Sequence, residues 1–341
     1  LRNVPLAVDV DLDASGNVAT DHMYVWTGNS ADEVSGTDGA DLIVSDNDAA
    51  GNDSMTGGAG DDVLVGGNEV LDAGATPGQG DAAVYTDVID VSAITLVADA
   101  NPFAPGDQAG WQVVSTTEGT DLLNDIEIVQ GADPAGAATG RTLLVGNGGF
   151  ATVQAAMDEA QDGDTILVAP GTWAGVTVDK AVTIVGFGNG TNPATSTIFS
   201  SGFTVNLDAD AAAGTVGFRN LAVQGAGINA GVDTNVLGTL VIDDVRVEDA
   251  ADSGLIVSGR KASSAYNAGG VQNVVITDST FIDNAQTGSN AANLMFFEFD
   301  GNATITNVDA SNTVTGGSSA AFGIQFAGFD GPLFDQLTPA P

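Results

Sequence analysis

Cysteine is absent from the 341-residue sequence, which excludes disulfides, thiolate metal sites and thiol nucleophiles. Basic residues are scarce, since 7 Lys and Arg stand against 45 Asp and Glu, for a formal net charge of −38. Histidine occurs once, at His22. No run approaches the roughly 20 apolar residues that a membrane span requires. A polyanion of this kind is expected to repel nucleic acid and anionic membranes, so neither is expected as a partner.

The acidic surplus has two interpretations that composition alone leaves open. The carboxylates are either solvated on a halophilic or marine type of surface, or many of them are ligands of divalent cations. Hydrophobic residues make up 43% of the chain, which is enough for a large core. The chain begins at Leu1 and shows no signal peptide, and we expect it to be a segment of a longer chain.

Residues 27–74 contain a repeat with a nine-residue period. Four units begin at Thr27, Gly36, Asp48 and Gly57. The sixth place of each unit is an aspartate, and these aspartates are Asp32, Asp41, Asp53 and Asp62. The eighth place is aliphatic or Met, occupied by Val34, Ile43, Met55 and Leu64. A flexible Gly/Asp linker does not explain apolar residues in phase, so the repeat predicts turns that alternate with short strands.

This repeat resembles the G-G-x-G-x-D-x-U-x signature of RTX calcium-binding nonapeptides. Two nonapeptides make one coil of a parallel β-roll, so Asp41 and Asp62 are expected in one column and Asp32 and Asp53 in another. Glycine turns bring backbone carbonyls together, and Ca²⁺ takes six to eight oxygen ligands. The predicted cofactor is Ca²⁺, and its predicted ligand residues are Asp32, Asp41, Asp53, Asp62, Gly36, Asp38, Gly39, Gly51, Gly57, Gly58 and Gly60.

The C-terminal part resembles a pectate-lyase-like right-handed parallel β-helix. Residues 150–161 have helical spacing and precede a β-branched strand and the segment Pro170-Gly171-Thr172-Trp173. We expect this helix to cap the first coil, whose open edge would otherwise pair with other chains. Later runs align at Phe218, Ile242, Ile276 and Ile305, one coil each. Asn220, Asp244, Asp278 and Asn307 share one place in that alignment, where a left-handed corner is expected.

The predicted fold is therefore all-β. Its expected parts are a leading strand and turn (1–26), an RTX β-roll (27–74), a small β module (75–140), and a right-handed parallel β-helix with an N-terminal capping helix (141–341). The segment Gly119-Thr120-Asp121-Leu122-Leu123-Asn124-Asp125-Ile126-Glu127 resembles the β module that often follows RTX repeats, with Asp125 where that module has Asn.

Candidate catalytic residues on the β-helix are few. Asp244, Arg246 and Glu248 have the i, i+2, i+4 spacing of one strand face and are the best cluster. They either hold a sugar acid, through calcium or acid–base chemistry, or form a surface row of ion pairs, and the second interpretation is favoured. Arg260 and Lys261, with Tyr266 nearby, form a second candidate contact patch.

Three functions remain open at this point. The favoured hypothesis is a calcium-stabilised structural or adhesive protein, secreted or on the cell surface, such as a surface-layer, matrix-fibre or adhesin component exported by the type I route. It would bind Ca²⁺ and either self-assemble or contact extracellular polysaccharide. The alternatives are a secreted polysaccharide lyase, epimerase or hydrolase, and a carbohydrate-binding β-helix without turnover. The scarcity of convergent acid, base and Arg or Lys groups argues against turnover.

Overall fold

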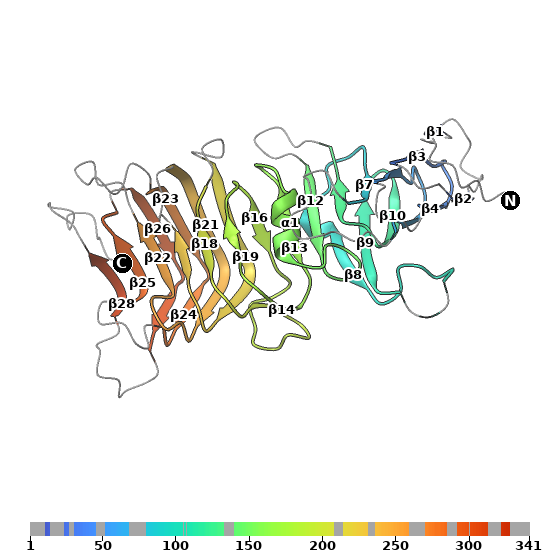
Figure 1. The fold of residues 1–341 in the computed structure, drawn as a ribbon. Coiled ribbons are helices and arrows are strands. Elements are labelled where there is room, and N and C mark those ends of the chain that lie inside the picture. Colours follow the sequence, from blue (N-terminus) through green and yellow to red (C-terminus); the bar gives the residue numbers. More distant parts are fainter. Residues whose placement is uncertain are drawn as a thin grey trace. The chain divides into compact units, whose positions relative to one another are not determined.

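The computed structural model describes residues 11–13, 24–26, 31–45, 52–67, 80–104, 106, 108–132, 140–207, 214–230, 236–258, 270–284, 292–299, 301–312 and 322–327. The chain divides into two compact units. Unit 1 contains residues 1–169 and 182–185, and unit 2 contains residues 170–181 and 186–341. Both units are built from β-sheets that are mostly parallel (Figure 1), so the predicted all-β fold of parallel β-roll or β-helix type is confirmed. No described helix is long and apolar enough to span a membrane.

The described part of unit 1 contributes strands to two sheets and also holds a short helix and a 3-10 turn. The strands of the first sheet, in spatial order, are β1 (Asp11–Asp13), β3 (Glu33–Ser35), β5 (Ser54–Thr56), β7 (Ala82–Val84), β11 (Ile128–Gln130), β12 (Arg141–Val145), β13 (Thr165–Val168) and β16 (Thr183–Val185). Those of the second are β2 (Tyr24–Trp26), β4 (Leu42–Val44), β6 (Val63–Val65), β10 (Gly119–Asn124), β9 (Gly110–Ser115) and β8 (Ile94–Val97). The helical elements are η1 (Val91–Ala93) and α1 (Val153–Glu159).

Successive short strands alternate between the two sheets, which is the arrangement of a β-roll. We call the parallel strands β1 to β7, β10 and β11 the roll. Val34, Ile43, Met55 and Leu64 fill its interior and are at most 1% exposed. The predicted core role of the eighth repeat place is therefore confirmed. Each sheet then reverses direction, because β9 pairs antiparallel with β10 and β12 pairs antiparallel with β11.

The helix predicted over residues 150–161 forms as α1. The Thr152 side chain caps it by accepting a hydrogen bond from the Ala155 amide at 3.1 Å. Its apolar face, including Val153 and Met157, is buried. Glu159, also buried, binds Arg141 of β12 at 2.8 Å, so an ion pair ties the helix to the sheet.

Unit 2 consists of parallel coils whose strands lie in two sets. The first set is β14 (Gly171–Trp173), β17 (Thr197–Phe199), β19 (Thr215–Gln224), β21 (Val236–Glu248), β23 (Gly270–Thr277), β24 (Thr280–Ile282), β26 (Asn302–Thr306) and β27 (Asp309–Ser311). The second set is β15 (Thr177–Val178), β18 (Phe203–Val205), β20 (Ile228–Ala230), β22 (Leu255–Ser258), β25 (Ala292–Phe297) and β28 (Phe322–Ala327). Phenylalanines line part of the core, where Phe203 contacts both Phe199 and Phe218.

The coils of unit 2 stack in the predicted register. Phe218 pairs with Ile242, which pairs with Ile276, which pairs with Ile305. The corner residues Asn220, Asp244, Asp278 and Asn307 all have left-handed φ angles, between 49° and 55°. Asn and Asp tolerate this conformation better than other non-glycine residues. The column predicted at the coil corner is therefore confirmed.

Candidate functional site

Six buried aspartates form two columns along the roll. In the first column, the Asp32 amide donates a hydrogen bond to Oδ1 of Asp53 at 2.7 Å, and the Asp53 amide donates to Oδ1 of Asp81 at 2.7 Å. The Asp81 amide then donates to Oε2 of Glu127 at 2.9 Å. Each of these carboxylates thus accepts from the backbone of the preceding coil, so parallel strand register sets the spacing of the column.

The second column follows the other sheet. The Asp41 amide donates to Oδ1 of Asp62 at 2.8 Å, and the Asp62 amide donates to Oδ1 of Asp121 at 3.0 Å. All three side chains are at most 3% exposed. The predicted stacking of Asp41 with Asp62, and of Asp32 with Asp53, is confirmed.

Sequence reasoning missed the later members of both columns, which are Asp81, Glu127 and Asp121. Leu123 pairs with Leu64, which places Asp121 directly after Asp62 in register. The sequence does hold a signal, since Gly119-x-Asp121-x-Leu123 repeats the spacing of Gly60-x-Asp62-x-Leu64. The roll therefore continues into the segment predicted as a separate module.

The glycine turns of successive coils stack closely. Backbone carbonyl oxygens and Asp carboxylate oxygens occupy the space that a side chain would need at these glycines. A Cβ on Gly36 would lie 2.0 Å from the Gly57 carbonyl oxygen and 2.5 Å from Oδ2 of Asp41. Gly58, with φ +101°, would place a Cβ 2.0 Å from the carbonyl oxygen of Thr37. Glycine is thus required at these positions, and oxygen atoms gather where it stands.

Asp41 and Asp62, in successive turns of the second column, differ in their hydrogen-bond partners. Both oxygens of Asp41 accept from the Thr37 hydroxyl at 3.0 Å, and its Oδ2 also accepts from the Thr37 amide. The equivalent place in the next turn is Gly58, which has no hydroxyl. Within the described part of the chain, the buried Oδ2 of Asp62 has no hydrogen-bond partner. A buried carboxylate oxygen of this kind is costly unless a cation or proton neutralises it.

Burial raises the pKa of Asp62 from its ordinary 3.8 to about 7. The charges of Asp41, Asp61 and Glu118 raise this pKa as well, against the lowering effect of the Asp41 amide. Burial likewise raises the pKa of Asp121 to about 8. Without cations, Asp62 and Asp121 therefore bind protons near neutral pH, and a metal ion would have to displace them.

The chemistry of these turns fits a hard cation. Asp62 and its neighbours offer oxygen atoms from carboxylates and carbonyls, with neither sulfur nor imidazole among them. Among the described residues, no three Asp, Glu or His side chains gather in a way that would hold a metal by themselves. A calcium ion between the turns would therefore take part of its ligand set from backbone carbonyls, such as that of Gly57.

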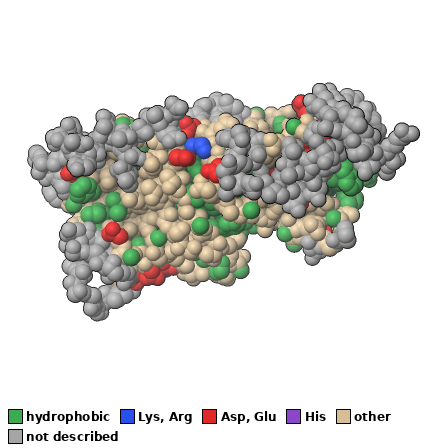
Figure 2. All heavy atoms as spheres, viewed as in Figure 1, with side chains coloured by type: hydrophobic (Ala, Val, Ile, Leu, Met, Phe, Trp, Pro, Cys, Tyr) green, Lys and Arg blue, Asp and Glu red, His purple; other side chains and the backbone are tan. Residues whose placement is uncertain are grey.

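The other predicted ligand residues differ in position. Gly39 is buried against Gly60 of the next turn, whereas the Asp38 side chain is exposed. Gly51 lies outside the described residues. On the face in Figure 2, acidic side chains of the described residues are scattered and few Lys or Arg side chains are visible.

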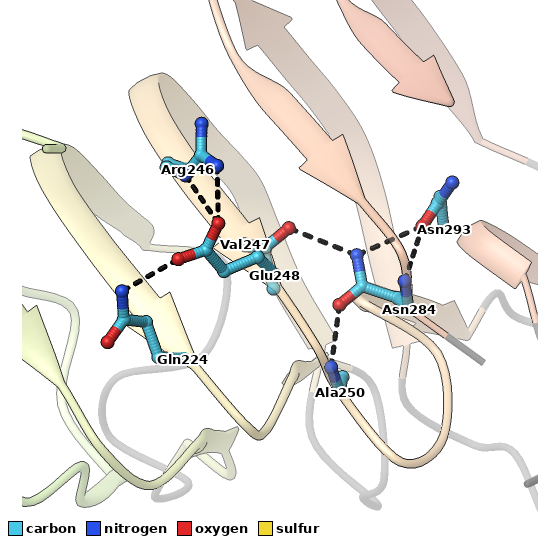
Figure 3. Close-up of polar contacts among 7 residues, drawn as sticks. All are labelled: Gln224, Arg246, Val247, Glu248, Ala250, Asn284 and Asn293. Atoms are coloured by element: carbon cyan, nitrogen blue, oxygen red, sulfur yellow. Dashed lines mark hydrogen bonds and ion pairs between the residues drawn. The ribbon is translucent and has the colours of Figure 1, made fainter. Parts of the chain in front are cut away.

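The candidate catalytic cluster on β21 is a satisfied polar row (Figure 3). Arg246 donates through Nε at 2.7 Å and through a second nitrogen to Oε2 of Glu248. Gln224 of the neighbouring coil donates to Oε1 of Glu248 at 2.7 Å. Both carboxylate oxygens of Glu248 are thus engaged, as expected for a surface ion-pair row.

Asp244 is placed differently from the other two members of that cluster. Its φ of +55° puts it at the left-handed coil corner, and Oδ1 accepts a hydrogen bond from Asn189 at 2.7 Å. Burial raises its pKa, and the charges of Asp243 and Asp278 add to this. The second contact patch, Arg260, Lys261 and Tyr266, lies outside the described residues.

Two buried asparagines beside the row link neighbouring coils (Figure 3). Asn284 donates to the Val247 carbonyl and to Oδ1 of Asn293, both at 3.0 Å, while its own Oδ1 accepts from the Ala250 amide at 2.9 Å. Asn293 in turn donates to the Ser311 carbonyl at 2.9 Å. These side chains satisfy backbone groups at a coil corner, which is a structural role.

Comparison with known proteins adds no family to this picture. No family model matches the chain, and the searches of curated proteins and of solved structures gave no significant match.

Proposed function

We propose that this chain is a calcium-binding extracellular protein with a structural or adhesive role, of the RTX type, such as a surface-layer, matrix-fibre or adhesin component. The roll of unit 1 would be its calcium-dependent part. The parallel coils of unit 2 would supply an extended surface for self-assembly or for contact with polysaccharide, as solenoid proteins commonly do.

The burial of the aspartate columns carries this proposal. A solvated acidic surface does not account for Asp32, Asp41, Asp53, Asp62, Asp81 and Asp121, because all six are at most 4% exposed. Buried carboxylates in stacked coils repel one another unless cations or protons neutralise them. The oxygen-rich glycine turns beside them favour calcium among the common divalent cations, since it accepts irregular sets of carbonyl and carboxylate ligands.

The extracellular location follows from the proposed ion. Extracellular modules commonly bind calcium with Kd values of about 10⁻⁴ to 10⁻³ M, which matches calcium outside cells and not the lower levels inside them. Absence of cysteine is compatible with one-step export by the type I route, which serves RTX proteins. The satisfied Arg246–Glu248 pair supports a structural reading of unit 2 over a catalytic one.

Thermal unfolding with and without calcium tests the proposal. Millimolar calcium is expected to raise the unfolding temperature of unit 1, because each site adds about 0.4–1.4 kcal/mol to the free energy of unfolding when calcium is about 1- to 10-fold above Kd. Replacing both Asp41 and Asp62 with Ala should reduce calcium uptake in calorimetry, whereas Asp158→Ala, at a half-buried helix position outside the roll, should not. Equal unfolding temperatures in calcium and in chelator would refute the proposal.

A second experiment separates the structural role from the enzymatic alternative. The protein is incubated with alginate and pectate in calcium, and the ultraviolet absorbance of new unsaturated sugar ends is followed. We expect no increase, together with calcium-dependent filaments or sheets in electron micrographs. A steady rise in absorbance would replace the structural role with a polysaccharide lyase activity.

A further inference from the structure

The last two turns of the second column, residues 57–62 and 116–121, stack as closely as the repeats before them. The Gly60 amide donates to the Glu118 carbonyl at 3.0 Å, and the Thr120 amide donates to Oδ1 of Asp61 at 2.9 Å. Gly119 has φ +103°, and a Cβ there would lie 1.8 Å from the carbonyl oxygen of Gly60. The 116–121 turn therefore takes the place of a further nonapeptide, although the chain between it and residue 67 is long.

The 116–121 turn has a buried glutamate at a place where the earlier turns have no buried acid. Glu118 stands at the third place of its turn, where the earlier turns have the exposed Asp38 and the half-buried Ala59. The Glu118 side chain is 6% exposed, and its Oε1 accepts from the Thr86 amide at 2.7 Å. Its Oε2 is buried and has no hydrogen-bond partner within the described part of the chain.

A second unpartnered carboxylate oxygen lies in the same region. It is Oδ2 of Asp62, a residue that is 1% exposed. The charge of Glu118 acts on Asp62, and the buried Tyr85 hydroxyl interacts with Asp121 beside them. Two unpartnered carboxylate oxygens in one buried, negatively charged region indicate a missing positive partner, because each would otherwise lose its hydration without a compensating interaction.

We propose that Asp62 and Glu118 bind a calcium ion between the 57–62 and 116–121 turns, where the nonapeptide array ends. This inference rests on the proposed function, since it adds one site to a calcium-binding roll. Backbone carbonyls of the two turns complete the ligand set, which needs only two acidic side chains. Asp121 continues the hydrogen-bonded column beside the ion, and the Tyr85 hydroxyl, which interacts with Asp121, fixes the orientation of that carboxylate.

Calorimetric titration of the full chain with calcium chloride tests the site. We expect Glu118→Gln to bind one ion fewer than the unmodified protein, because Gln keeps the acceptor for Thr86 and removes the charge. The matched control is Asp61→Asn, which removes an exposed charge from the adjoining 57–62 turn, keeps the acceptor for Thr120, and should leave the count unchanged. Circular dichroism in calcium checks that each variant folds.

Tyr85→Phe gives an independent readout if Glu118→Gln does not fold. It removes one hydroxyl from a buried ring, so the ion count should stay the same while one Kd rises about tenfold or more. An unmodified protein that binds no calcium would refute the proposed function and this site together. Calcium binding that neither Glu118→Gln nor Tyr85→Phe alters would refute this site and leave the proposed function standing.

Discussion

The backbone amide of Asp41 donates a hydrogen bond to the carboxylate of Asp62, one coil further along the roll, at 2.8 Å. The side chain of one repeat therefore holds the backbone of the previous one, and strand register and carboxylate position are set together. The second carboxylate oxygen of Asp62 is left for another partner. Changing this residue should thus act differently with and without calcium.

Asp62→Asn is expected to have opposite effects under the two conditions. In chelator at pH 8, above the raised pKa of Asp62, it should raise the unfolding temperature, because a buried charge disappears while an acceptor for the Asp41 amide remains. In millimolar calcium it should lower the unfolding temperature, because a ligand is lost. Differential scanning calorimetry of both proteins under both conditions measures this. A shift of the same sign in calcium and chelator would contradict the assigned role of Asp62.

The calcium-free protein should lose stability as pH rises from about 4 to about 8. The pKa values of Asp62 and Asp121 are raised on folding, to about 7 and about 8, so both carboxyls bind protons more tightly in the folded state. Their stabilising contribution is complete below the unfolded pKa near 3.9 and is lost as pH passes the folded values. Asp41, Asp61, Glu118 and Tyr85 are the neighbouring titratable groups.

Thermal unfolding in chelator across this pH range measures the effect. The acidic limit is set by groups such as Asp87, whose pKa is lowered by hydrogen bonds from Thr116 despite partial burial, and whose contribution is lost as pH falls. With calcium present, the decline towards pH 8 should weaken or disappear, because the ion takes the place of the proton. An unfolding temperature that rises steadily with pH in chelator would be incompatible with these raised pKa values.

Gly58→Ala should destabilise the roll by more than the usual cost of a left-handed alanine. The φ of +101° costs an alanine about 1–2 kcal/mol, and the Cβ would also meet the Thr37 carbonyl at 2.0 Å. Gly225→Ala is a matched control, because its φ is +74° but nothing lies within 4 Å of the added Cβ. Urea unfolding of both variants in calcium separates backbone strain from crowding. Equal losses in the two would show that the turns can move apart.

Asp244→Asn should preserve the coil corner, whereas Asp244→Ala should weaken it. Asn tolerates the left-handed angle, keeps an acceptor for Asn189 and removes repulsion from Asp243 and Asp278. We expect unfolding free energies of unit 2 that are unchanged or slightly higher for Asn, and about 1 kcal/mol lower for Ala. Alanine and asparagine variants of equal stability would mean that the corner is not strained.

Removing the buried Asn284 should cost more than breaking the ion pair beside it. Asn284→Ala leaves the Ala250 amide and the Val247 carbonyl without their partner. This loss should lower the free energy of unfolding by about 1–3 kcal/mol. Arg246→Ala breaks a partly exposed pair and should cost under about 1 kcal/mol. Chemical denaturation of the two variants compares them directly. A larger loss for Arg246→Ala would indicate that the row has a function that its geometry does not explain.

The sequence allowed much of the roll to be predicted because its period is local. Val34 and Ile43, and likewise Met55 and Leu64, lie nine residues apart, with a three-residue insert between the two pairs, and this regular burial sets the register of the neighbouring aspartates. The corner at Asp244 was equally readable, since Asn and Asp recur where each coil bends.

The rest of the site could not be predicted because long-range pairing creates it. Asp121 joins Asp62 only because β10 adds to the same sheet as β6, after an intervening segment that includes β8 and β9. Thr116 and Thr117 stand where the repeat has its first two glycines, so the turn that carries Glu118 does not match the repeat in sequence. The glycines before Asp81, Gly78 and Gly80, fall at the third and fifth places of the unit and not at its glycine places, and the alanine at the eighth place, Ala83, is too common to be diagnostic.

The antiparallel pairing of β9 with β10, and of β12 with β11, ends the parallel stacking of the roll at a fixed coil. A duplicated nonapeptide pair inserted before β4 could join the stack and lengthen it by one turn of the spiral. The same pair inserted after β10 would meet strands that run the opposite way and would find no matching edge. The number of coils could therefore change in evolution by insertion on the amino-terminal side alone, because the antiparallel strands prevent further coils from adding at the other end of the roll.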